Sequence, residues 1–218
     1  MDEQMKEIQT LLEKSDLEGA AKKLIELIEE NPEEPIHYVN FANLLVELSQ
    51  YDEAIKIYER AIQLDKEMAT AYYGLGTIYY ELEDFDKSLT FLKEALSLGL
   101  DHSDVYFMVG MTLIQKEQFM YALTYLQRAS ELDQEDLNKL FQYGLTLAQA
   151  NYLTEAKAIL EEVLQKDSSH ADAMYNLAII AVHDEDVNLA VQYLEDSLAS
   201  EPNHTLSQQA LDLIKNQS

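Results

Sequence analysis

The sequence predicts an all-α protein, a right-handed solenoid of antiparallel helix pairs. The chain of 218 residues contains only three prolines and six glycines, so obligatory turns are few and helices are favoured. One pattern of small and large apolar residues returns every 34 residues. A fixed period of this size is typical of stacked helix-turn-helix units, each of which buries its apolar face against its neighbours.

The clearest copy of the pattern is residues 69–102. It contains two amphipathic segments joined by a short polar turn; Tyr72 and Leu75 lie on the first, and Phe85 and Leu92 on the second. A shift of 34 residues in either direction reproduces the arrangement without an insertion. We therefore expect a single array of six blocks and a final segment, with boundaries 1–34, 35–68, 69–102, 103–136, 137–170, 171–204 and 205–218.

Small residues recur at fixed places within the block, where two helices must cross closely. A large apolar residue also returns at the twenty-fourth place, for example Leu92 and Leu126. The eighth place holds Ala42, Gly76, Gly110, Gly144 and Ala178, and the twentieth holds Ala20, Ala54, Ser88, Ala122, Ala156 and Ala190.

These places, with aromatic residues at the fourth, resemble the tetratricopeptide repeat family over essentially the whole chain. The departures lie towards the ends. The first block has Gln4 and Ile8 where an aromatic and a small residue are usual, and the last two blocks have Leu140 and Met174 at the fourth place. The resemblance implies the helix-pair solenoid, with the first helix of each pair lining its concave face.

The final segment, 205–218, is predicted to be a capping helix. Leu206, Ala210, Leu213 and Ile214 share one face, while the opposite face is polar. Such a helix covers the last repeat and turns a polar side to water.

The composition excludes several functional classes. Without cysteine, the chain can form neither a disulfide framework nor a cysteine-ligated zinc site. The acidic, amphipathic N-terminus lacks the features of a signal peptide, and no apolar run approaches the roughly 20 residues that span a bilayer. We therefore expect a soluble, cytoplasmic protein.

The formal net charge is −26, from 15 basic and 41 acidic residues. Binding to nucleic acid or to an anionic membrane uses clustered lysine and arginine, so neither partner is expected. A basic protein segment would be attracted, although a charge of this sign also serves solubility alone.

No catalytic motif is present. The sequence has no phosphate-binding loop, nucleophile elbow or paired-histidine metal motif, and we expect no enzyme activity, cofactor or metal. Three histidines, His102, His170 and His204, end their blocks. Equivalent residues of adjacent repeats lie about 10 Å apart, too far to share one ion.

The concave face implied by the resemblance carries the predicted binding site. It corresponds to the second, fifth, sixth, ninth, twelfth and thirteenth places, and the fifth is apolar or aromatic in every block. An exposed apolar stripe usually marks an interaction surface, although packing between neighbouring first helices would bury part of it. The candidate residues are Val39, Asn43, Tyr73, Thr77, Tyr80, Phe107, Met108, Met111, Phe141, Gln142, Leu145, Tyr175, Asn176 and Ile179.

The sequence thus predicts a non-catalytic scaffold or adaptor that binds a peptide segment of another protein. The basic residues of the family's carboxylate-binding subtype are missing, so an apolar, mixed or basic segment is expected rather than an acidic tail. Two alternatives remain. The stripe could join copies of the chain into a homo-oligomer, or the array could regulate an enzyme or transcription factor in response to a peptide.

Overall fold

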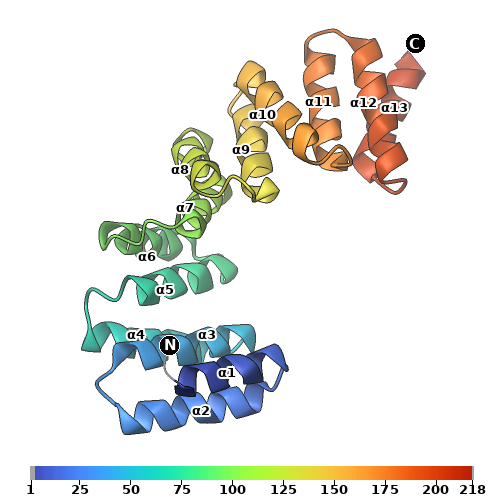
Figure 1. The fold of residues 1–218 in the computed structure, drawn as a ribbon. Helices are drawn as coiled ribbons and strands as arrows, with labels where there is room; N and C mark the ends of the chain where they lie inside the picture. The colour runs from blue at the N-terminus through green and yellow to red at the C-terminus, as the bar shows by residue number, and fades with distance from the viewer. Residues whose placement is uncertain (1–2, 218) are drawn as a thin grey trace. The chain divides into compact units, whose positions relative to one another are not determined.

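The computed structural model describes the backbone of residues 3–217 and the side chains of residues 3–216. Over these residues the chain forms thirteen α-helices and no strand, as Figure 1 shows. The all-α prediction is confirmed. The chain divides into two compact units, Met1–Asp101 and His102–Ser218, which we describe separately.

The first unit contains three antiparallel helix pairs. The first helices of the second and third pairs begin at Pro35 and Ala69, the residues that open the second and third predicted blocks. The helices are α1 (Glu3–Glu13), α2 (Leu17–Glu30), α3 (Pro35–Glu47), α4 (Tyr51–Leu64), α5 (Ala69–Glu81) and α6 (Phe85–Ser97).

The second unit contains three further pairs and a final single helix. Its helices are α7 (Ser103–Gln115), α8 (Phe119–Leu132), α9 (Leu137–Gln149), α10 (Leu153–Lys166), α11 (Ala171–His183), α12 (Val187–Ser200) and α13 (Thr205–Gln217).

Small residues allow the two helices of the third pair, and those of the fourth, to approach closely. A Cβ atom built on Gly76 of α5 would lie 2.6 Å from Cγ of Leu92 on α6. The same holds for Gly110 of α7 and Leu126 of α8, again at 2.6 Å. Both leucines are fully buried, so a side chain at either glycine has no room. The pattern of small residues read from the sequence is therefore a helix-crossing pattern.

The turn inside each pair has the same backbone geometry in all six pairs. The fifteenth place has a left-handed φ between 57° and 66°. In the third pair, the Glu83 amide donates to the Tyr80 carbonyl and the Asp84 amide to the Tyr79 carbonyl, at 3.0 and 2.9 Å. This pattern is a common way to satisfy the last carbonyls of a helix. The residues at this place are Ser15, Ser49, Glu83, Glu117, Asn151 and Glu185.

Glycine at the left-handed place is expected to stabilise the protein. Glu83→Gly should raise the free energy of unfolding by about 0.5–1 kcal/mol, because a side chain at φ 59° is strained and glycine is not. Urea unfolding measures the change. Glu59→Gly, at an exposed residue inside α4, is the control and should lower stability by about 1 kcal/mol. Equal losses in both variants would contradict the assignment.

The capping helix α13 is present, but the predicted buried face is partly wrong. Leu211 and Ser207 are buried, whereas Leu206 and Leu213 are 48% and 63% exposed. On the buried side, Leu211 packs with Ala178 and Leu194, and the hydroxyl groups of Ser207 and Ser197 of α12 share a buried hydrogen bond of 2.8 Å. The side of α13 that meets the last pair is thus part apolar and part polar, and the apolar pattern along the helix does not identify the contribution of Ser207.

Candidate functional site

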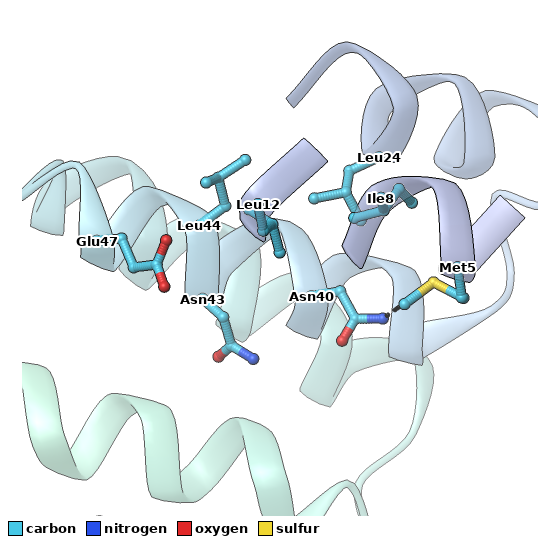
Figure 2. A pocket seen from close by; sticks show the side chains of 8 residues that line it. All are labelled: Met5, Ile8, Leu12, Leu24, Asn40, Asn43, Leu44 and Glu47. Carbon is cyan, nitrogen blue, oxygen red and sulfur yellow. Dashed lines mark hydrogen bonds between the residues drawn. The ribbon is translucent and has the colours of Figure 1, made fainter. Parts of the chain in front are cut away.

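A pocket of about 260 Å³ lies in the first unit, between α1 and α3. Its floor is formed by Ile8, Leu24 and Leu44, which belong to one buried cluster. Met5 and Leu12 of α1 form one rim, and Figure 2 shows them beside the floor residues. The opposite rim is polar and comes entirely from α3, with Asn40, Asn43 and Glu47.

The polar rim presents hydrogen-bonding groups next to the apolar floor. Asn43 and Glu47 are exposed. The Tyr58 hydroxyl donates to Oδ1 of Asn43, which leaves the Asn43 amide nitrogen as the group that can donate to a ligand. Burial raises the pKa of Tyr58, so its hydroxyl remains a donor at neutral pH. The Asn40 amide lies 3.8 Å from Sδ of Met5 across the pocket. The pocket can therefore receive an apolar side chain and bind polar groups beside it.

Sequence reasoning named only Asn43 among these lining residues as a candidate. Asn40, Glu47 and Leu12 occupy the sixth, thirteenth and twelfth places, which belong to the same predicted face. The signal was thus present in the places that these residues occupy, Leu12 in the first block and Asn40 and Glu47 in the second.

The other predicted residues of the first unit differ in burial. Val39 is 3% exposed and packs in the core with Ala42 and Leu45, so its assignment to the binding surface is wrong. Tyr73, Thr77 and Tyr80 of α5 are partly exposed. The Thr77 hydroxyl donates to the Gly74 carbonyl at 2.8 Å, and the Tyr80 ring meets Phe85 edge to face at 5.8 Å.

In the second unit, Phe141 is also buried, at 8% exposure. Its ring packs on His170 with 4.6 Å between centroids, and it belongs to the core cluster of α9, α10 and α11. Its assignment to the surface is therefore wrong as well. Tyr175 is partly exposed and its ring lies 5.7 Å from that of His204. The Asn176 amide donates to the Asp172 carbonyl of its own helix at 2.8 Å.

The remaining candidates of the second unit leave apolar surface on the first helices. Ile179 is 44% exposed. The others are partly exposed and are distributed over α7 and α9: Phe107, Met108, Met111, Gln142 and Leu145.

The three histidines that end their blocks cap the helices that follow. Nδ1 of His170 accepts a hydrogen bond from the Ala173 amide, and Nδ1 of His204 from the Ser207 amide, both at 3.2 Å. Nδ1 of His102 accepts from the Asp104 amide at 3.3 Å. Each imidazole thus satisfies an amide that has no partner within its own helix.

A buried lysine in the second unit was not predicted. Lys139 of α9 is 4% exposed, and its Nζ lies 2.8 Å from Asp104, 2.9 Å from Asp133 and 3.0 Å from Asp136. Burial alone would lower the Lys139 pKa, but the hydrogen bonds to the three carboxylates outweigh it and raise the pKa. The hydrogen bond from Lys139 lowers the pKa of Asp133. The cluster joins α7, the 133–136 turn and α9.

Comparisons with known proteins place the chain in a family. Two tetratricopeptide repeat models match it, one over residues 33–101 and the other over 147–214. A crystal structure of YrrB, described as a TPR protein with an unusual peptide-binding site, is 37% identical with a TM-score of 0.82. That match covers 88% of this chain and 98% of YrrB. The chain belongs to the tetratricopeptide repeat family.

More distant solved structures also have a similar fold. PilF of Pseudomonas aeruginosa has a TM-score of 0.79 at 18% identity, and the match covers 94% of each chain. MamA has a TM-score of 0.72 at 18% identity, covering 78% of this chain and 93% of MamA. At this identity the likeness concerns the fold alone. A search of curated proteins gives no significant match.

Membership of this family supports a role in protein–protein interaction, since tetratricopeptide repeat proteins are generally non-catalytic scaffolds. Among the described residues, none of the helices has the length and apolar character required to cross a membrane.

Proposed function

We propose that this protein is a non-catalytic scaffold whose first-helix face binds a peptide segment of another protein. The observation that carries the proposal is the pocket between α1 and α3, which combines an apolar floor with exposed amide and carboxylate groups. Such a mixture is typical of sites that take one apolar anchor and fix its orientation through a few polar contacts.

The charge of the chain and of the pocket favours a basic segment. Glu47 is the only charged residue among the pocket-lining residues, and the whole chain carries a net charge of −26. A lysine or arginine beside the apolar anchor would meet Glu47 and would be steered to the acidic chain. The partner segment is therefore an aliphatic or aromatic residue flanked by a basic one.

In the second unit, we propose that the exposed apolar residues of α7, α9 and α11 also bind peptide segments. Met111, Leu145 and Ile179 occupy the ninth place in successive repeats, where Asn43 occupies it in the second. Methionine adapts to partners of different shape, which suits a protein with more than one ligand. We assign the protein to the cytoplasm on its composition.

Two other functions are weaker. Self-association through the first-helix face would bring two strongly acidic chains together at the face that carries Glu47. A peptide-responsive regulator would need polar anchors, and the Asn176 amide already donates to its own helix, which leaves Asn43 and Gln142.

Selection of random peptides on the full-length protein tests the proposal. The enriched peptides are expected to share one aliphatic or aromatic residue next to lysine or arginine. Leu12→Asn should weaken the best peptide by at least about tenfold, because it removes the apolar rim. Glu47→Gln should weaken basic peptides by about fivefold and neutral ones much less.

Leu48→Asn is the matched control, because Leu48 is 39% exposed against 36% for Leu12 and does not line the pocket. Peptides that bind the Leu12 variant and the Leu48 variant equally well would refute the site.

A further inference from the structure

The second helix of the fourth pair, α8, begins without the stabilising N-terminal residues that the other second helices have. Second helices begin either with an aspartate cap, as Asp84 does for α6, or with acids in the first turn, as Asp52 and Glu53 do in α4. Among the second helices of the described pairs, α8 alone has neither a side-chain cap nor a first-turn acid. In their place it has Met120 and Tyr121.

These two residues gain little from packing. Tyr121 is 69% exposed, the highest value among the large hydrophobic residues that the structure describes, and Met120 is 55% exposed. A cap or a first-turn acid would be worth about 0.5–1 kcal/mol each. Residues that break a local rule without a packing gain are expected at functional surfaces.

The second helix of the fifth pair, α10, also begins at an exposed aromatic residue that provides no capping hydrogen bond. Tyr152, 38% exposed, occupies the N-cap of α10 without a side-chain cap hydrogen bond. Leu123 of α8 and Leu153, the residue that follows Tyr152, both pack against the core cluster that contains Leu147. The turn before α8 and the 150–152 turn occupy equivalent places in adjacent stacked pairs, so they lie on the same edge of the second unit.

The charge of this edge indicates what covers it. The turns 48–53, 82–87 and 184–189 carry two or three more acids than bases, whereas 116–121 and 150–155 together carry one base and two acids. A basic partner would prefer the acidic surfaces, which this chain has elsewhere. A second copy, itself strongly acidic, can approach closely only at a nearly neutral apolar edge.

We propose that the edge formed by Met120, Tyr121 and Tyr152, the "apolar edge", binds a second copy of this chain. The contact is isologous, with the 116–121 turn of one copy on the 150–155 turn of the other. Tyrosine and methionine supply the contact area, as they do in the cores of interfaces. The apolar edge shares no residue with the pocket between α1 and α3, so the dimer can be tested without a peptide.

Sedimentation equilibrium of the full chain from micromolar to near-millimolar concentration tests the proposal. A dimer is expected, and it should tighten at high salt because salt screens the repulsion between the acidic chains. Met120→Asp with Tyr121→Glu introduces the residue types found at these places in the second pair. This variant should become monomeric while its melting temperature rises, because the new acids complement the helix N-terminus.

Two further variants separate apolar contact from charge. Met120→Asn with Tyr121→Gln adds no charge and should weaken the dimer by at least about tenfold. Leu48→Glu with Leu82→Glu adds two acids to the turns of the first unit and should leave the dimer unchanged. The proposal is overturned if the wild-type chain stays monomeric, if the neutral variant dimerises as the wild type does, or if the control variant also becomes monomeric.

Discussion

Replacing Lys139 with methionine is expected to lower the free energy of unfolding by about 2 kcal/mol. The Nζ atom lies within 3.0 Å of oxygens from Asp104, Asp133 and Asp136, and the lysine side chain is only 5% exposed. Methionine leaves three converging carboxylates with no cation between them. Removal of one partner from a buried pair typically costs 3–5 kcal/mol, and the partial exposure of the aspartates reduces this figure to about 2.

The cost of the Lys139 substitution should depend on pH. The lowered pKa of Asp133 means that its contribution to stability is present above its ordinary value of 3.8 and is lost as pH falls through the folded value. The raised pKa of Lys139 means that its contribution is present below its ordinary value of 10.5 and is lost only above that pH. The difference between wild type and Lys139→Met should therefore be full at pH 7 and shrink below pH 3.8.

Urea unfolding across this pH range measures the effect, and a compensated variant controls for packing. Lys139→Met combined with Asp133→Asn and Asp136→Asn removes the repulsion and should recover most of the lost stability at pH 7. If the compensated variant is no more stable than Lys139→Met, the loss comes from packing and the electrostatic explanation is wrong.

The Lys139 cluster also shows why part of the structure could not be read from the sequence. Lys139 is the third residue of its block, and the third residue of the adjacent blocks is apolar, Val105 in one and Ala173 in the other. From the sequence alone, a single lysine at this place would be interpreted as a solvated charge. Lys139 itself lies on α9, and its partners come from α7 and from the 133–136 turn before α9. A periodic pattern assigns residues to faces but does not bring charges from three segments together.

The burial of Val39 and Phe141 could not be predicted from the sequence for a related reason. The period identifies the side of each first helix on which Val39 and Phe141 lie, but not how deep they are. Depth depends on how closely neighbouring helices pack, and both residues belong to core clusters that include the next repeat. By contrast, Gly76 and Ser88 could be assigned correctly to the helix crossing. A crossing between the two helices of one pair depends only on residues within the same 34-residue block.

Gly110→Leu is expected to lower the free energy of unfolding by about 1–3 kcal/mol. A Cβ atom at Gly110 would already lie 2.6 Å from both Cγ and Cδ2 of Leu126, and a leucine side chain extends further. Leu126 is fully buried and cannot turn towards solvent. Overpacking of this kind forces the two helices apart or the leucine out of its rotamer, at a cost of about 1–3 kcal/mol.

The size of the effect should follow the geometry of each crossing. At Gly144 the nearest side-chain atom to an added Cβ is Cγ2 of Ile159, at 3.0 Å, so Gly144→Ala should cost less than Gly110→Ala. Thermal and urea unfolding compare the two. In a double-mutant cycle, Leu126→Ala should relieve part of the Gly110→Ala penalty, giving a coupling energy of about 1 kcal/mol. A Gly110→Leu protein that unfolds at the wild-type midpoint would mean that α7 and α8 do not cross at this residue, and the assignment of the eighth place throughout the array would fail with it.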